Sequence, residues 1–161
     1  MSKPWHWFTA SALIVLADQL TKWVVLARLA PGERREVTEF FNLVLVFNKG
    51  AAFSFLAEAG GWQTPILVAF AIGAALIVSW LLLRSRGRRT FCAGLALILG
   101  GALGNVIDRL RFGHVVDFLD LHAGGWHWPA FNVADSAITL GAALLILDGF
   151  AHHESRARAP S

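Results

Sequence analysis

The apolar residues of this chain are gathered into four long runs, separated by shorter and more polar segments. The runs cover approximately residues 7–29, 65–83, 91–110 and 133–152. Each is close to the roughly 20 residues that a helix needs to cross the hydrocarbon core of a bilayer. The pattern therefore predicts four transmembrane helices. The first is expected to be a retained span rather than a removable signal peptide, because Asp18 and Lys22 interrupt it.

The composition agrees with a membrane protein. Of the 161 residues, 56% are hydrophobic and only 16% are charged, whereas soluble domains average about 25% charged residues. The chain is basic, with a net charge of +3, but its basic residues form short clusters between apolar runs rather than a nucleic-acid-binding face. One cysteine excludes an internal disulfide and a site with several cysteine ligands. We expect a single domain over 1–152, a disordered tail over 153–161, and no nucleic-acid partner.

The direction of the spans follows from the arginines. The connection "RSRGRR" (84–89) holds four arginines and no acid, which is typical of a cytoplasmic loop. Lys3, Arg156 and Arg158 at the two ends of the chain agree with it. Both termini are therefore expected in the cytoplasm, with the longer connections 30–64 and 111–132 outside.

The first outer connection contains "FFNLVLVFNKGAAFSFL" (40–56), which is rich in strand-forming residues and carries the turn signal Asn48-Lys49-Gly50. It predicts a small β-sheet at the outer membrane surface. Trp62, Trp126 and Trp128 flank the outer ends of the spans, where tryptophan often anchors a protein in the membrane interface. The small residues of "AGLALILGGALGN" (93–105) let helices approach closely and favour a packed bundle.

Several polar residues occur inside or at the edge of the spans, where burial is expensive and a functional role is the first hypothesis. Asp18 and Lys22 are four residues apart, so on a helix they share a face and can pair. In "GNVIDR" (104–109), Asn105, Asp108 and Arg109 form one polar stripe. Asp108 and Arg109 can also form an ion pair. Each of the two pairs can either brace the bundle or belong to a site, and the sequence leaves both interpretations open.

Three aspartates lie in or beside the outer connection between the third and fourth spans: Asp117, Asp120 and Asp135. Asn132 and Asp135 stand at the start of the fourth span, where capping and the helix dipole also favour such residues. Asp117 and Asp120 would share one face of a helix but point oppositely on a strand. Topology brings all of these groups to one membrane depth. Two carboxylates in a poorly solvated site support acid–base chemistry, because one stays ionised while the other keeps its proton.

Other chemistries have weaker support. The sequence has no HExxH and no GxSxG motif. His114, His122 and His127 are spaced by eight and five residues, which matches no standard metal-ligand pattern. The glycines of "LGGALGN" (99–105) lie within an apolar span, so helix packing explains them better than phosphate binding. A small transporter or channel component with intramembrane Asp and Lys residues remains an alternative from another class, and a structural anchor is a third.

The chain resembles the lipoprotein signal peptidases, the bacterial signal peptidase II family, over nearly its whole length. The resemblance rests on five blocks in order: "DQLTK" (18–22), "FNKGAAFS" (47–54), "GGALGNVIDR" (100–109), "GHVVDFLD" (113–120) and "PAFNVADS" (129–136). It implies an aspartic endopeptidase with four transmembrane helices in the bacterial inner membrane, acting near the periplasmic face. Such an enzyme removes the signal peptide of prolipoproteins just before the diacylglyceryl-modified cysteine.

The resemblance also implies roles for particular residues. The catalytic pair carries over to Asp117 of "HVVDF" and Asp135 of "NVADS", which leaves Asp120 outside the pair. The polar residues expected to support the pair or bind substrate are Asp18, Lys22, Asn48, Asn105, Asp108, Arg109 and Asn132. The outer sheet, with Phe53, Phe55 and Trp62, is expected to cover a groove open to lipid. No metal or organic cofactor is expected, the partners are prolipoproteins and membrane lipids, and nothing requires more than a monomer.

Overall fold

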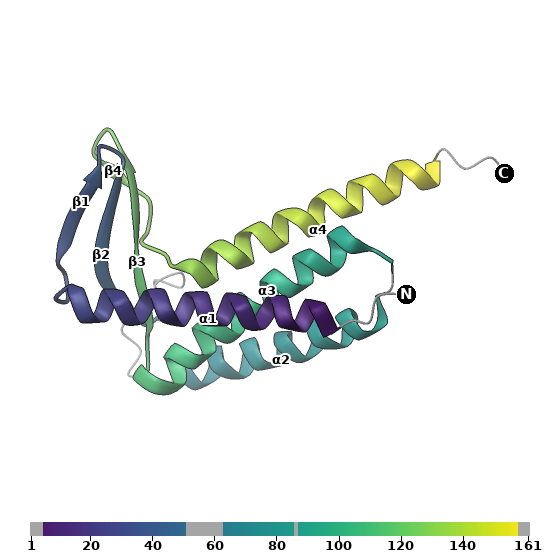
Figure 1. Ribbon diagram of the computed structural model, residues 1–161, viewed down its shortest axis with the longest axis horizontal. Coiled ribbons are helices and arrows are strands. Elements are labelled where there is room, and N and C mark those ends of the chain that lie inside the picture. The colour runs from purple at the N-terminus through teal and green to yellow at the C-terminus, as the bar shows by residue number, and fades with distance from the viewer. Residues whose placement is uncertain (1–4, 51–62, 86, 158–161) are drawn as a thin grey trace.

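The computed structural model describes residues 5–50, 63–85 and 87–157. Four long helices lie lengthwise beside one another, and a four-stranded sheet stands across one end of the bundle (Figure 1). The elements in chain order are α1 (Trp5–Arg28), β1 (Arg34–Thr38), β2 (Phe41–Asn48), α2 (Gln63–Arg84), α3 (Arg89–Phe112), β3 (Val115–Ala123), β4 (Trp126–His127) and α4 (Val133–Ala157). All four helices are long and apolar enough to cross a membrane, so the four predicted spans are confirmed.

Helix α3 is the centre of the bundle and packs against α1, α2 and α4. Its small residues let the neighbouring helices come close, as the sequence predicts. A Cβ atom on Gly101 would lie 2.3 Å from the carbonyl oxygen of Ala134 in α4. A Cβ atom on Gly104 would lie 2.6 Å from Oδ2 of Asp18 in α1. Because glycine has no Cβ at these two positions, α1 and α4 can pack closely against the half of α3 that lies nearer the sheet.

The sheet is antiparallel, in the order β1-β2-β3-β4. The sequence places a sheet in the first outer connection, whereas the structure draws β3 and β4 from the second connection as well. Val116 and Phe118 of β3 pack with Val25 and Leu29 of α1, so one face of the sheet rests on the end of α1. Because Asp117 and Asp120 lie on a strand, they point to opposite faces. This resolves the choice that spacing alone leaves open.

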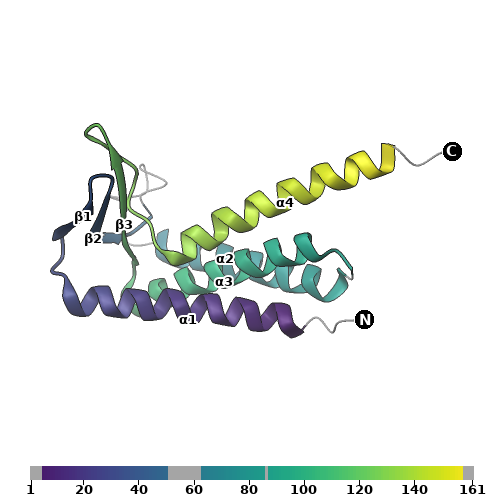
Figure 2. The same ribbon diagram turned by 45° about the horizontal axis from the view of Figure 1, so that its top comes forward.

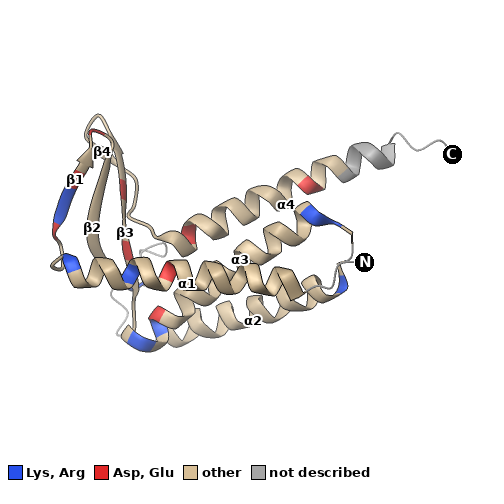
Figure 3. Ribbon diagram, in the orientation of Figure 1, with Lys and Arg blue, Asp and Glu red and all other residues tan. Residues whose placement is uncertain are grey.

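The two ends of the bundle differ. Helix α1 begins, α4 ends and the α2–α3 connection lies at the end away from the sheet (Figures 1 and 2). Figure 3 shows charged residues near both ends of the bundle and on the sheet, with long uncharged stretches of helix between them. Helix α4 extends to Ala157, so residues 153–157 continue a helix where the sequence predicts a disordered tail. Residues 51–56 of the predicted sheet, with Phe53, Phe55 and Trp62, lie outside the described residues.

Candidate active site

The candidate site lies where β3 and the beginning of α4 meet α1 and α3. Asp117 stands in β3 with 1% of its surface exposed, and Asp135 stands in the first turn of α4. A short antiparallel bridge brings the two elements together. Phe131 accepts hydrogen bonds from the backbone N–H groups of Phe118 and Leu119 at 3.0 and 2.8 Å, and its own N–H donates to Leu119 at 3.0 Å. Asn132 follows immediately and so lies beside Asp117.

Asn132 connects both candidate catalytic residues. Its Nδ2 donates to Oδ1 of Asp117 at 2.7 Å. Its Oδ1 accepts a hydrogen bond from the backbone N–H of Asp135 at 2.9 Å, which makes it the N-cap of α4. The capping role that the sequence allows is therefore real, but Asn132 rather than Asp135 is the residue that caps. Asn132 is completely buried.

Asn105 of α3 completes the connection between the two carboxylates. Its Nδ2 donates to Oδ1 of Asp135 at 2.8 Å, and its Oδ1 accepts from Nδ2 of Asn132 at 3.2 Å. On the other side of Asp117, Nδ2 of Asn48 donates to Oδ2 at 2.9 Å. Both carboxylates therefore take hydrogen bonds from asparagine amides, and two of these amides contact each other.

Lys22 of α1 lies next to Asn105 and is 2% exposed. Its ammonium contacts Oδ2 of Asp18 and Oδ2 of Asp108, each at 2.8 Å, and donates to Oδ1 of Asn105 at 3.1 Å. Oδ1 of Asp18 also accepts from the N–H of Ala134 at 2.9 Å, and Oδ2 of Asp108 from that of Val116 at 3.0 Å. The buried ion pairs thus brace the bundle and also join the elements that carry Asp117 and Asp135.

Arg109 takes a different place from the one its spacing suggests. Asp108 pairs with Lys22 rather than with its neighbour Arg109. The Arg109 guanidinium donates to the carbonyl oxygen of Asn105 at 3.4 Å, and its charge interacts most strongly with Asp135, then with Asp117. Arg109 is half-buried and supplies positive charge to the candidate site.

Burial is the main cause of an unusual pKa at Asp117. It raises the pKa of this carboxyl from 3.8 to about 7, against the lowering effect of the Asn48 hydrogen bond. The negative charge of Asp135 adds to the rise, while the hydrogen bond from Asn132 opposes it. Near neutral pH, Asp117 is therefore present in both its protonated and its ionised form. A carboxyl that can hold a proton, next to a second carboxylate, is the arrangement that acid–base catalysis requires.

Asp120 points to the other face of β3 and takes no part in this group. Nδ2 of Asn42 donates to its Oδ2 at 2.8 Å, and Nδ1 of His127 lies 2.8 Å from its Oδ1. Burial raises the pKa of Asp120, but the hydrogen bonds from Asn42 and His127 outweigh it, and the pKa lies below the usual value. Asp120 therefore stays ionised at neutral pH.

Metal-binding chemistry gains no support from the histidines. Among residues 5–50, 63–85 and 87–157, no group of three or more His, Cys, Asp or Glu side chains is arranged to hold a metal ion. The ring of His114 lies 4.3 Å from that of Phe47, and the rings of His122 and His127 stack at 4.9 Å. These histidines make aromatic contacts instead.

The structure brings together all nine residues that the sequence singles out for the site, and it adds one. Nε2 of Gln19 donates to Oδ1 of Asp108 at 2.9 Å and to the carbonyl oxygen of Gly104 at 3.2 Å. Gln19 lies inside an apolar span beside Asp18, and a polar residue in that position is itself a signal of function or bracing. The same criterion that selects Asp18 and Lys22 would have found it.

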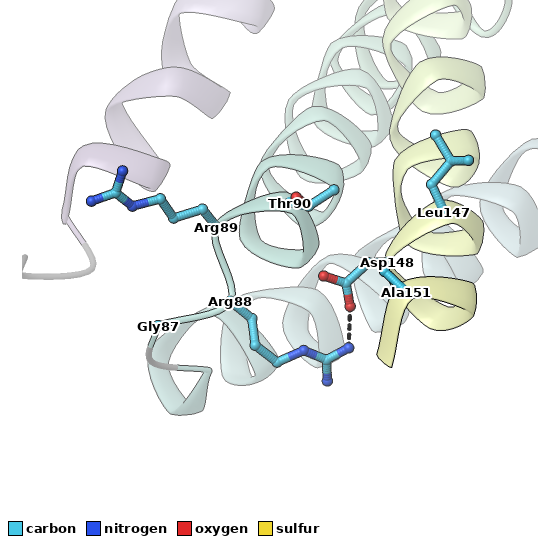
Figure 4. Close-up of a pocket in the computed structure, with 7 residues that line it drawn as sticks. All are labelled: Gly87, Arg88, Arg89, Thr90, Leu147, Asp148 and Ala151. Carbon is cyan, nitrogen blue, oxygen red and sulfur yellow. Dashed lines mark hydrogen bonds and ion pairs between the residues drawn. The ribbon is translucent and has the colours of Figure 1, made fainter. Parts of the chain in front are cut away.

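A separate pocket of about 480 Å³ lies at the other end of the bundle, between the start of α3 and the later part of α4 (Figure 4). Arg88 and Asp148 form an ion pair across it. At 1.5 Å per helical residue, Arg89 at the start of α3 is about 24 Å from Asn105. This pocket is therefore remote from the candidate active site.

The sequence matches a known protein family over most of its length. Residues 10–151 match the family model of signal peptidase (SPase) II. The lipoprotein signal peptidase of Paraburkholderia phytofirmans is 61% identical over 142 residues, which cover 88% of this chain and 83% of that protein. The lipoprotein signal peptidase of Janthinobacterium sp. is 58% identical over 142 residues, covering 88% of this chain and 86% of the relative.

Two solved structures of bacterial membrane enzymes, obtained by the in meso method at 2.3 and 1.9 Å resolution, share the fold. The first has a TM-score of 0.83 at 26% identity and covers 97% of this chain and 94% of its own. The second has a TM-score of 0.77 at 29% identity and covers 88% and 90% of the two chains. The chain therefore belongs to the signal peptidase II family, the membrane proteases that process lipoproteins.

Proposed function

We propose that this protein is an aspartic endopeptidase whose catalytic pair is Asp117 and Asp135. It removes the signal peptide from prolipoproteins by cleaving just before the cysteine that carries the diacylglyceryl group. The observation that carries the proposal is the chain of amides between the two carboxylates, in which Asn132 bonds Asp117, Asn105 bonds Asp135, and the two asparagines bond each other. An arrangement that serves only to brace helices would not need to join two carboxylates in this way.

The reaction follows from the different surroundings of the two acids. Asp117, with its pKa raised to about 7 by burial, serves as the acid of the pair, and Asp135, the carboxylate with which Arg109 interacts most strongly, serves as the base. A water molecule between them gives its proton to Asp135 while its oxygen attacks the carbonyl carbon of the scissile bond. Asp117 donates its proton to the carbonyl oxygen.

The tetrahedral intermediate then collapses. The carbon–nitrogen bond breaks, the proton held by Asp135 passes to the departing amine, and the hydroxyl proton of the intermediate returns to Asp117. Asn132 and Asn48 hold Asp117 from both oxygens, so the acid keeps its orientation through the cycle. Arg109 limits the repulsion between the two carboxylates while negative charge passes between them. This mechanism needs no metal, so cleavage is expected to persist in the presence of a chelator such as EDTA.

The position of the pair suits a substrate that is anchored in lipid. Asp117 stands in β3 and Asp135 in the first turn of α4, so both lie at the end of the bundle that carries the sheet (Figure 1). A peptide can reach them there while the acyl chains on its cysteine remain in the bilayer. The arginines of 84–89 favour the opposite end as the cytoplasmic one, so the catalytic pair faces the periplasm. The protein acts as a monomer on prolipoproteins, in contact with membrane lipids and without nucleic acid.

The proposal is tested by replacing Asp117→Asn and Asp135→Asn separately and measuring cleavage of a diacylglyceryl-modified prolipoprotein peptide. Each variant is expected to lose at least a thousandfold in kcat, because the pair works as one unit. Asp148→Asn, a buried acid at the far end of the bundle, is the matched control and is expected to retain cleavage. If either Asp117→Asn or Asp135→Asn cleaved at a rate close to that of the unchanged protein, the assignment of the pair would be wrong.

A further inference from the structure

Asp120 contacts all three other strands of the sheet. Its carboxylate accepts a hydrogen bond from Asn42 of β2 at 2.8 Å. Nδ1 of His127 in β4 lies 2.8 and 3.0 Å from its two oxygens, and Nε of Arg34 in β1 lies 3.7 Å from Oδ2. Only 4% of Asp120 is exposed. A buried carboxylate with partners on three strands fixes their relative positions.

The pairing of β2 with β3 changes between Asp120 and Asp117. Asn42 stands opposite Asp120, but Val46 stands opposite Asp117. Over this stretch β2 therefore contains one residue more than β3. The irregularity lies between Leu43 and Val46 and is a β-bulge, which bends the strand and redirects side chains. A bulge can move along a strand, and a change of register by one residue turns side chains to the opposite face.

The bulge has a specific side-chain pair on each side. The hydrogen bond between Asn42 and Asp120 fixes the register before the bulge. The hydrogen bond of 2.9 Å between Asn48 and Asp117 fixes the register after the bulge. If the first pair were lost, the extra residue of β2 could move toward Asn42. The strand β3 would then be free to shift against Asn48, and Asp117 would move with it.

The contact between Asp120 and His127 fixes the start of the segment that leads from β4 to α4. His127 lies opposite His122 in β4, and the N–H of Trp128 donates to the carbonyl oxygen of Leu121 at 2.8 Å. Three residues further on, Phe131 bonds to Leu119, and Asn132 follows. Two contacts therefore hold together the two sides of the loop between Asp117 and Asn132. One joins Asp120 to His127, and the other joins Leu119 to Phe131.

We propose that Asp120 is a positioning residue for the catalytic pair: through Asn42 it fixes the register of β3 at the bulge, and through His127 it fixes the segment that delivers Asn132. It touches neither substrate nor the reacting atoms. This inference rests on the proposed function, because it gives Asp120 a part in placing Asp117 and Asn132. It gives a role to Asp120, which the resemblance leaves outside the catalytic pair.

The test compares Asp120→Ala with a variant that exchanges the partners, Asn42→Asp together with Asp120→Asn. In the exchanged pair the amide of residue 120 donates to the carboxylate of residue 42, while its carbonyl oxygen still accepts from His127. Both variants are made in the full-length protein, and cleavage of the diacylglyceryl-modified peptide is measured from pH 5 to 9. We expect Asp120→Ala to lower kcat at least tenfold with KM changed less than twofold, and the exchange to recover kcat to within about threefold.

The pH profile separates positioning from a general loss of stability. The hydrogen bond from Asn48 lowers the pKa of Asp117, so a shift of register that breaks it moves the limb of the profile that reports Asp117 to higher pH in Asp120→Ala. The exchanged variant is expected to return that limb to its original position. A variant that is merely less stable would keep the limb unchanged and lose amplitude only.

Each outcome decides the question. A kcat lowered less than tenfold in Asp120→Ala, or a raised KM with unchanged kcat, overturns the inference. If Asp120→Ala fails to fold, the exchanged variant decides alone: recovery of kcat supports the inference, and a folded exchanged protein with kcat reduced more than tenfold overturns it. Failure of the proposed function looks different, because then Asp117→Asn would still cleave in the same assay, or the unchanged protein would not cleave at all.

Discussion

Nδ2 of Asn132 lies 2.7 Å from Oδ1 of Asp117. Oδ1 of the same side chain caps α4 by accepting a hydrogen bond from the backbone N–H of Asp135. The side-chain amide of Asn132 therefore orients Asp117 of β3 and also fixes the start of α4, the helix that carries Asp135. Neither oxygen nor nitrogen of this amide can be replaced without a distinct consequence. This separation of roles makes Asn132 a sensitive position for experiment.

Asn132→Ser and Asn132→Ala are expected to differ in stability but not in cleavage. Serine is a good N-cap and keeps the acceptor for Asp135, whereas alanine removes it and loses about 1 kcal/mol of stability. Both variants lose the donor to Asp117 and are expected to cleave at least tenfold more slowly. Apparent Tm in detergent and kcat on a lipidated peptide check the two effects. A serine variant with normal kcat would show that the contact with Asp117 is dispensable.

Asp117→Asn is expected to be inactive and yet more stable than the unchanged protein at pH 8. The folded-state pKa of Asp117 is raised from 3.8 to about 7, so the native state binds more protons than the unfolded state between these values. The stabilisation by the neutral acid is fully present below about pH 4 and is lost as pH rises through about 7, an effect of roughly 4 kcal/mol at most.

Asparagine has the shape of the protonated acid and does not titrate, although its NH2 group cannot accept, so one of the two hydrogen bonds from Asn48 and Asn132 is lost. This loss costs the same stability at every pH, whereas the titration of Asp117 does not. Denaturation curves in detergent at pH 5, 6, 7 and 8 measure the difference between Asp117→Asn and the unchanged protein. The difference is expected to grow with pH and to level off above about pH 8. A difference that stayed constant over this range would contradict a raised pKa at Asp117.

The spans and most of the polar residues around the candidate site could be predicted from local signals in the sequence, whereas Asn48 and the choice of Asp117 with Asp135 rest on the family resemblance. A carboxylate or amide in an apolar run is conspicuous, and helical spacing places Asp18 beside Lys22, which the 2.8 Å contact confirms. The second ion pair of Lys22, with Asp108 of α3, could not be read in this way. It depends on how two helices are rotated against each other, which neither spacing nor composition specifies.

The sheet shows the same limit. Strand β2 comes from the segment 40–56 with its strong strand signals, whereas β1 (Arg34–Thr38) lies before that segment and was not predicted. Strand β3 lies in a connection with a buried acid at two of its nine positions. Its residues are buried on both faces near Asp117, so the alternation that reveals a half-exposed strand is missing. The bulge opposite Phe118 has no signal in the sequence at all, because it is set by cross-strand pairing.

Lys22→Met separates bracing from participation in the site, the two interpretations that the spacing of Asp18 and Lys22 leaves open. Loss of the Lys22 ammonium leaves the buried carboxylates of Asp18 and Asp108 without a positive partner, which is expected to lower stability by about 3–5 kcal/mol. Adding Asp18→Asn and Asp108→Asn removes the stranded charges and is expected to recover most of the apparent Tm.

Cleavage is not expected to recover with stability in this triple variant. Lys22 also donates to Oδ1 of Asn105 at 3.1 Å, and Asn105 orients Asp135, so we expect kcat to stay about tenfold low. Recovery of both Tm and kcat in the triple variant would assign Lys22 to bracing alone.

Gly104→Ala tests whether the close approach of α1 and α3 is needed at the site. The added Cβ would lie 2.6 Å from Oδ2 of Asp18 and 3.3 Å from the Cβ of Ala134. Asp18 would have to move, which breaks its contact of 2.9 Å with the N–H of Ala134 and displaces the start of α4. Overpacking of this kind lowers stability by about 1–3 kcal/mol, and we expect kcat to fall at least tenfold.

Gly73→Ala in α2 is the matched control, because a Cβ there meets no atom within 4 Å. It is expected to keep normal cleavage and to gain a little stability, since alanine is a better helix former than glycine by about 1 kcal/mol. The two variants are compared by apparent Tm and by kcat on the same lipidated peptide. If Gly104→Ala cleaved as fast as Gly73→Ala, the contact of Asp18 with α4 would have no part in holding Asp135, and the connection from Lys22 through Asn105 would have to do so alone.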